Sequence, residues 1–153
     1  MAHEAADVTI RAASSADAPA LASLLGELGY PAEAESVQRR MLRLLGAGDA
    51  SPTDSVFVAS AGAEAAVVGL LSVHRFVALH DDADVGLITA LVVAERARGL
   101  GVGRRLVDRA VDTARGWGCT RLLVTTHVRR ADAHAFYEHI GFEFTGRRYV
   151  KSL

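Results

Sequence analysis

The spacing of apolar residues divides the first part of the chain into one short strand and two helices. Residues 8–13 (VTIRAA) have strand character. Apolar residues then recur at helical spacing after Asp17, which is placed to cap a helix that Pro31 ends. A second amphipathic helix is predicted for residues 33–45. The predicted buried faces are formed by Leu21, Leu24, Leu25 and Leu28 in the first helix and by Val37, Met41, Leu42, Leu44 and Leu45 in the second.

Three strongly apolar segments follow the loop at residues 46–54. Residues 55–60 and 66–77 flank the sequence AGAEA, which predicts a hairpin between two strands. Residues 85–93 (VGLITALVV) are apolar at almost every position. We therefore expect both faces of this third strand to be buried in the centre of a sheet.

Helices and strands alternate in the remainder of the chain. The pattern predicts a helix at residues 102–116, a buried strand at 121–126 and a short helix at 131–141. The sequences FEFTG (142–146) and RRYVKSL (147–153) predict an antiparallel pair that closes the sheet. The order indicates an α/β fold, more closely an α+β sandwich. Its single mixed, largely antiparallel sheet should have about six to seven strands, with helices on both faces.

Length and composition restrict the class of protein. The chain has 153 residues, half of them hydrophobic, which suits a single domain over residues 1–153. A net charge of −1 argues against a nucleic-acid partner. The one cysteine, Cys119, excludes a disulfide within the chain and favours a reducing compartment. With neither a signal peptide nor about 18 consecutive apolar residues, the sequence predicts a cytoplasmic protein without a membrane partner.

The glycine-rich segment RARGLGVGRRL, residues 96–106, joins the third strand to the next helix. Glycine lets backbone N–H groups approach a ligand, and a helix N-terminus attracts anions, so the segment predicts a phosphate or diphosphate site. A dinucleotide-binding loop would need G-x-G-x-x-G in the first strand–helix unit. A triphosphate-binding loop would need a lysine and a hydroxyl residue after its last glycine. Neither pattern is present.

The pattern that fits is R-x-x-G-x-G, formed by Arg98, Gly101 and Gly103. Together with the preceding LVV (91–93) and the later AFYEHIGF (135–142), it resembles the GNAT superfamily of acyl-CoA-dependent N-acyltransferases, in particular a branch of small bacterial N-acetyltransferases. The resemblance covers most of the chain. It implies an enzyme that uses acetyl-CoA as cosubstrate and acetylates the primary amine of a small molecule or peptide while both are bound.

The resemblance also implies which residues hold the cosubstrate. The glycine segment would bind the diphosphate of CoA through backbone N–H groups, assisted by the surrounding arginines, Arg105 among them. Residues 91–93 would pair with the pantetheine arm, and an N–H near Leu91 or Val92 would stabilise the thioester oxyanion. The implied cosubstrate-binding residues are Leu91, Val92, Val93, Arg98, Gly99, Leu100, Gly101, Val102, Gly103 and Arg104.

Tyr137 matches the tyrosine that members of this family use as a general acid toward the departing CoA thiolate. The base is less evident, because relatives often carry a glutamate just before the LVV sequence, where this chain has Thr89 and Ala90. The alternatives are a relayed water or one of four side chains: His74, His127, Asp84 and Glu27.

The sequence also has to be compared with what other functions would require. A non-catalytic acyl-CoA-binding sensor would need the same loop, whereas a nicotinamide-linked enzyme would need a different glycine spacing. The histidines lack the spacing of metal ligands, so no metal is predicted. The acceptor amine has no signature in the sequence, and the resemblance allows either a monomer or a homodimer.

Overall fold

The computed structural model describes residues 7–48 and 50–153. The chain forms two compact units, Met1–Leu123 and Val124–Leu153. The first contains nearly all of the sheet and three of the helices, and the second contains one helix. In the part of the chain that the structure describes, no helix is long and apolar enough to cross a membrane.

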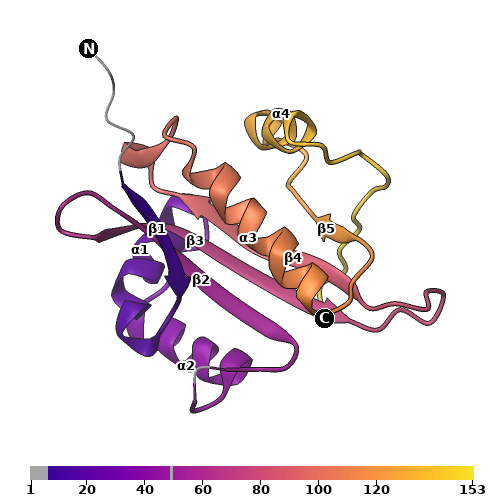
Figure 1. Ribbon diagram of the computed structural model, residues 1–153, viewed down its shortest axis with the longest axis horizontal. Helices are drawn as coiled ribbons and strands as arrows, with labels where there is room; N and C mark the ends of the chain where they lie inside the picture. Colours follow the sequence, from indigo (N-terminus) through magenta and orange to yellow (C-terminus); the bar gives the residue numbers. More distant parts are fainter. Residues whose placement is uncertain (1–6, 49) are drawn as a thin grey trace. The chain divides into compact units, whose positions relative to one another are not determined.

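The sheet is mixed and largely antiparallel, as predicted (Figure 1). The first four strands pair antiparallel in chain order. The Gly86 N–H donates to the Arg121 carbonyl over 3.1 Å, so the fifth strand begins beside the beginning of the fourth and the two run parallel. The strands, in sheet order, are β1 (Val8–Ala12), β2 (Asp54–Ala61), β3 (Ala66–Phe76), β4 (Val85–Val93) and β5 (Leu122–Val124).

The predicted count of six to seven strands is not confirmed, because the described residues form five. The expected closing pair is wrong: residues 142–153 form neither strand nor helix. The large apolar side chains that suggested strands there, Phe144, Tyr149 and Val150, are 80%, 83% and 80% exposed. A two-stranded pair is barely stable without a third strand or a packed face. Strand-like alternation alone therefore did not produce a strand.

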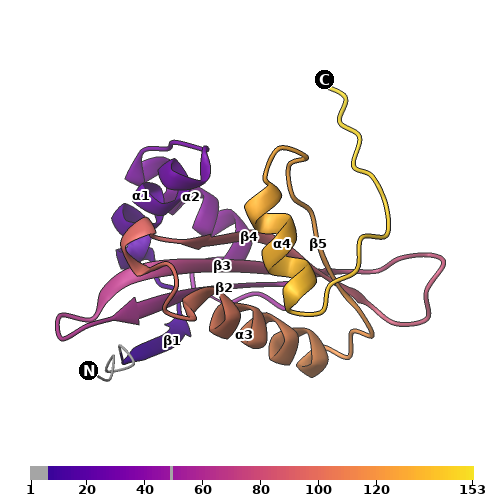
Figure 2. The same ribbon diagram turned by 90° about the horizontal axis from the view of Figure 1, so that it is seen from above.

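Helices cover both faces of the sheet (Figure 2). The helices α1 (Ala18–Leu28) and α2 (Ala34–Leu45) lie on one face and α3 (Val102–Gly116) lies on the other. A Cβ added to Gly69 on β3 would come within 2.9 Å of the Leu106 side chain and 3.2 Å of the Val102 side chain. The α3 helix thus packs closely on β3, which fixes the start of the helix at one end of the strands.

Two details of the first helices differ from expectation. Asp17 precedes α1 but does not cap it with its side chain; its carboxylate binds Arg11 over 2.7 Å and accepts the Ser14 N–H over 2.8 Å. In α2, Leu42 and Leu44 are exposed, and the buried residues are Val37, Met41 and Leu45. Positions four apart share one helix face, so an unbroken leucine-rich stretch cannot be buried along its whole length.

The unit of residues 124–153 is built around α4 (Ala131–His139). Gly141 follows the helix with φ of 99°, in the left-handed region that glycine adopts readily. The Phe142 N–H then donates to the Tyr137 carbonyl over 2.9 Å. These contacts fix the end of the helix that carries Tyr137.

Candidate active site

The fourth strand contains a bulge opposite Ser72. Ala90 pairs with Ser72 and Ile88 pairs with Val73, so Thr89 is an extra residue without a partner on β3. The Thr89 hydroxyl donates to the Ser72 carbonyl over 3.2 Å. A bulge reverses the direction in which the following backbone groups point.

This reversal determines which amides of β4 are available to a ligand. The Ala94 N–H donates to the Val68 carbonyl on β3 over 2.8 Å. Amide directions alternate along a strand, so the Val92 amide also points toward β3, and the Leu91 and Val93 amides point the other way. Of the two predicted oxyanion donors, the geometry therefore favours Leu91 over Val92, whose N–H is used within the sheet.

The glycine segment begins with the short 3-10 helix η2 (Glu95–Ala97) and continues directly into α3. Gly99 and Gly101 have φ of 78° and 77°, in the left-handed region that suits glycine. A Cβ built on either residue would meet no atom within 4 Å. Glycine is thus required here by backbone conformation, and the space beside both residues is open.

The N-terminus of α3 presents unpaired amides. Gly101 occupies the N-cap position and no side chain caps the helix. The Arg105 N–H makes the first helical bond, to the Gly101 carbonyl over 3.1 Å. The N–H groups of Val102, Gly103 and Arg104 precede it and have no partner within the helix. Three amides and the positive end of a helix dipole together suit an anion such as a diphosphate.

The arginines of the glycine segment differ in what their side chains contact. Arg96 donates to the Val67 carbonyl over 3.2 Å, and Arg98 donates through Nε to the Val93 carbonyl over 3.3 Å. Both side chains thus tie the loop to the ends of β3 and β4. Arg104 lies 4.0 Å from Asp108, one turn along α3. The Arg104 side chain is exposed beside the start of α3, because its pairing with Asp108 is long and weak.

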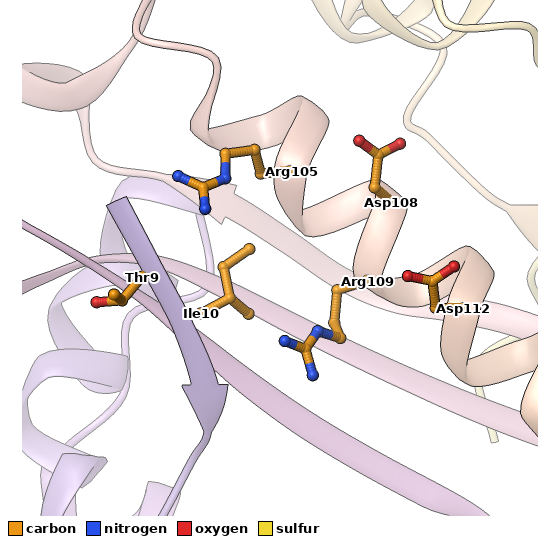
Figure 3. A pocket seen from close by; sticks show the side chains of 6 residues that line it. All are labelled: Thr9, Ile10, Arg105, Asp108, Arg109 and Asp112. Atoms are coloured by element: carbon orange, nitrogen blue, oxygen red, sulfur yellow. The ribbon is translucent and has the colours of Figure 1, made fainter. Parts of the chain in front are cut away.

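Arg105 points elsewhere, into a groove of about 390 Å³ between β1 and α3 (Figure 3). Thr9 and Ile10 line it from β1. The helix contributes arginines and aspartates in equal number: Arg105, Asp108, Arg109 and Asp112. The sequence did not reveal this groove, because its residues come from distant parts of the chain, and only Arg105 belongs to the predicted site, where it was expected to attract CoA.

Tyr137 lies in α4, and aromatic neighbours fix its ring within the second unit. The ring meets Phe136 and Phe142 edge-on, with centroids 5.2 and 5.5 Å away. Burial raises the pKa of the Tyr137 phenol, against a smaller lowering effect of Arg130. Within residues 124–153 the hydroxyl has no hydrogen-bond partner, so its O–H group is available to another acceptor.

The four candidate bases have distinct environments. Glu27 accepts the Glu95 N–H over 3.2 Å, and Asp84 lies 3.5 Å from Arg75. His127 accepts the N–H of Arg129 through Nδ1 within a local turn. His74 binds the Asp54 carboxylate through Nδ1 over 2.9 Å. Across residues 7–48 and 50–153, no three His, Cys, Asp or Glu side chains are grouped closely enough to hold a metal ion.

Comparison with known proteins places this geometry in a family. Residues 20–142 match the model of the acetyltransferase (GNAT) family. An aminoglycoside N(6')-acetyltransferase type 1 from Stenotrophomonas maltophilia is 33% identical over 142 residues, covering 91% of this chain and 88% of that protein. The aminoalkylphosphonate N-acetyltransferase of Salmonella typhimurium is 36% identical over 87 residues, which span 57% of this chain and 56% of that enzyme.

Solved structures share the fold over almost the whole chain. A transcriptional regulator from Bacillus halodurans superposes with a TM-score of 0.83 and 26% identity, covering 95% of this chain and 99% of that one. An aminoglycoside N-acetyltransferase in complex with CoA superposes with a TM-score of 0.79 at 16% identity, covering 100% and 99%. The bulged strand, the glycine turn and the uncapped helix all lie within residues 20–142, the part of the chain that the family model matches. The chain belongs to the GNAT family of acetyltransferases and is an acetyl-CoA-dependent acyltransferase.

Proposed function

We propose that this enzyme transfers the acetyl group of acetyl-CoA to the primary amine of a small molecule or peptide, by direct attack while both substrates are bound. The observation that carries the proposal is the alignment of free amides along one stretch of backbone. The outward amides of Leu91 and Val93 lead through the open glycine turn to the unpaired N–H groups at the start of α3.

The cosubstrate uses these groups in order along its length. The pantetheine arm pairs with the amides of Leu91 and Val93 as an added strand would. The diphosphate accepts hydrogen bonds from the backbone between Gly99 and Arg104, where the two left-handed glycines leave room for it. Because the contacts are made by the backbone, they depend on the shape of the loop more than on any one side chain.

The acetyl transfer needs an oxyanion donor and a proton donor. The Leu91 N–H is fixed by the bulge at Thr89 and donates to the carbonyl oxygen that becomes negative as the amine attacks. Tyr137 gives its proton to the sulfur of CoA as the C–S bond breaks, and the nitrogen of the tetrahedral intermediate returns a proton to the phenolate. The phenol is protonated at neutral pH, as this role requires; burial raises its pKa further and makes it a weaker acid, so the role depends on its placement beside the sulfur.

Small-molecule amines are the acceptors best supported by the comparisons. Two relatives are named for aminoglycosides and aminoalkylphosphonates, which share a primary amine on a polar, flexible scaffold. Residues 1–153 act in this proposal as one acetyltransferase domain, in the cytoplasm.

Thiol release from acetyl-CoA tests the proposal. The purified protein is incubated with acetyl-CoA and a panel of amines that includes aminoglycosides and aminoalkylphosphonates, and free CoA thiol is measured. Release that requires an amine, with an acetylated product of matching mass, is expected. Tight binding of acetyl-CoA without release from any amine would instead support a sensor that binds acyl-CoA without turnover.

A further inference from the structure

A histidine and an aspartate are paired across β2 and β3, outside the cosubstrate site. Asp54 and His74 are register partners, and Asp54 Oδ1 lies 2.9 Å from His74 Nδ1. A carboxylate only accepts hydrogen bonds, so Nδ1 carries the proton and donates it. This tautomer leaves the lone pair of Nε2 available. Within the described residues, Nε2 makes no hydrogen bond, and the His74 side chain is 36% exposed.

The aspartate is itself held in place. The Thr53 hydroxyl donates to Asp54 Oδ2 over 2.8 Å, and Ser51 Oγ lies 3.3 Å from Thr53 Oγ1. The carboxylate is mostly buried, with 13% of its side chain exposed. The imidazole also stacks on Phe76, with ring centroids 6.2 Å apart and planes 17° apart. Enzymes often hold a catalytic histidine in this way: a fixed carboxylate binds one ring nitrogen and so sets the tautomer of the imidazole and the direction of the other nitrogen.

The pair lies close to the bulge of β4. Gly69 faces α3, so the alternation along β3 places Ser72 and His74 together on the opposite face. Residues two apart in a strand are about 7 Å apart. Ser72 is the residue whose carbonyl holds the Thr89 hydroxyl at the bulge. The His74 side chain therefore lies next to that of Ser72 on β3, and Ser72 is opposite the bulge that turns the Leu91 amide away from β3.

Two of the other candidates, Asp84 and Glu27, lack this combination. Asp84 pairs with Arg75, and Arg75 is on the α3 face, opposite to His74. The Glu27 carboxylate accepts the Glu95 N–H and so helps to hold the start of the glycine segment. Among these three residues, only His74 has a side chain that lies near the bulge, is held in orientation by another residue and keeps a free lone pair.

We propose that His74 is the general base of the acetyl transfer and that Asp54 is its positioning residue. The inference rests on the proposed function. His74 Nε2 takes a proton from the ammonium form of the acceptor and passes it to solvent after the reaction. The neutral amine then forms its N–C bond to the thioester carbonyl carbon, the C–S bond breaks, and the sulfur leaves with the proton that Tyr137 supplies.

Two nearly isosteric small acceptors test this role. Ethylamine is protonated at neutral pH and needs a base, whereas methoxyamine is neutral there and does not. Thiol release from acetyl-CoA is measured with each acceptor at high concentration, after the non-enzymatic rate is subtracted. The variants are His74→Gln, Asp54→Asn and, as a matched control on an exposed histidine of α4, His139→Gln.

We expect His74→Gln to lower kcat with ethylamine by about 100-fold and to leave the rate with methoxyamine close to that of the wild type. Asp54→Asn is expected to lower the ethylamine rate by at least about 10-fold, with the same sparing of methoxyamine, and His139→Gln should change neither. Equal loss with both acceptors, or no loss, would overturn the role of His74 while leaving the acetyltransferase in place. If the wild type releases no thiol with either acceptor or with any amine of the panel described above, the proposed function fails and the role of His74 fails with it.

Discussion

Replacing Gly101 by aspartate or asparagine separates charge from shape at the proposed diphosphate site. Both side chains are of similar size, and both residue types tolerate the left-handed backbone better than other L-residues do. Gly101 has φ of 77°, and a Cβ there meets no atom within 4 Å. Each variant should therefore lose about 1 kcal/mol of stability for backbone conformation, and the fold should persist in both.

The two variants should differ in their affinity for acetyl-CoA. In Gly101→Asp, the introduced carboxylate would stand in the open space before the uncapped start of α3, where the diphosphate is proposed to lie. Two unit charges about 4 Å apart repel by about 1 kcal/mol in water and by about 4 kcal/mol at an effective dielectric constant of about 20. Because about 1.4 kcal/mol changes Kd by a factor of ten, Gly101→Asp should bind acetyl-CoA at least about 10-fold more weakly than Gly101→Asn.

Calorimetric titration of the wild type and both variants with acetyl-CoA gives the three values of Kd, and thermal unfolding gives the matching stabilities. A salt series adds a control, since the difference between the variants should shrink as screening increases. Equal affinities for two folded variants would refute the placement of the diphosphate at this helix N-terminus.

Three further changes test other parts of the account. Gly69→Ala brings a methyl group within 2.9 Å of the Leu106 side chain and should cost about 1–3 kcal/mol of unfolding free energy in urea denaturation; a neutral result would mean that α3 packs loosely. Tyr137→Phe should lower kcat by about 100-fold and leave the Kd of acetyl-CoA nearly unchanged, and an unaltered rate would limit the tyrosine to packing. The hydrogen bond from Arg11 lowers the pKa of Asp17 below its ordinary value of 3.8. The stability that Asp17 contributes is thus present above about pH 4 and is lost as pH falls through the folded pKa. Asp17→Asn should cost about 1 kcal/mol at neutral pH and progressively less in acid, whereas a constant difference would contradict the pairing.

The candidate cosubstrate site could be proposed from sequence because its residues are nearly continuous along the chain. The end of β4, the glycine turn and the start of α3 are consecutive, and their ligand contacts are made by backbone groups whose geometry follows from glycine and from helix ends. The mixed sheet was predicted from the order of apolar strand and helix segments along the chain. Strand segments at 55–60, 66–77 and 85–93 were predicted within about two residues of their observed ends.

Three features needed information that a linear pattern lacks. The bulge at Thr89 lies in a strand that is apolar on both faces, so no change of alternation marks the position where the amides reverse. Residues 142–153, where closing strands were predicted, alternate apolar and polar side chains but, in the described part of the chain, have no further strand or packed face to stabilise a pair. The pairing of Asp54 with His74 joins residues 20 positions apart and depends on the register of a hairpin that itself shifts between Ala59 and Ser60.

Amide hydrogen exchange, measured by NMR with and without acetyl-CoA, tests most directly whether acetyl-CoA is held by the outward amides of β4 and by the N-terminus of α3. Binding should slow the exchange of the Leu91, Val93 and Gly103 amides and leave that of Val92, already bonded within the sheet, unchanged. Acetyl-CoA that binds without slowing exchange at Leu91 and Gly103, or that does not bind at all, would contradict the account.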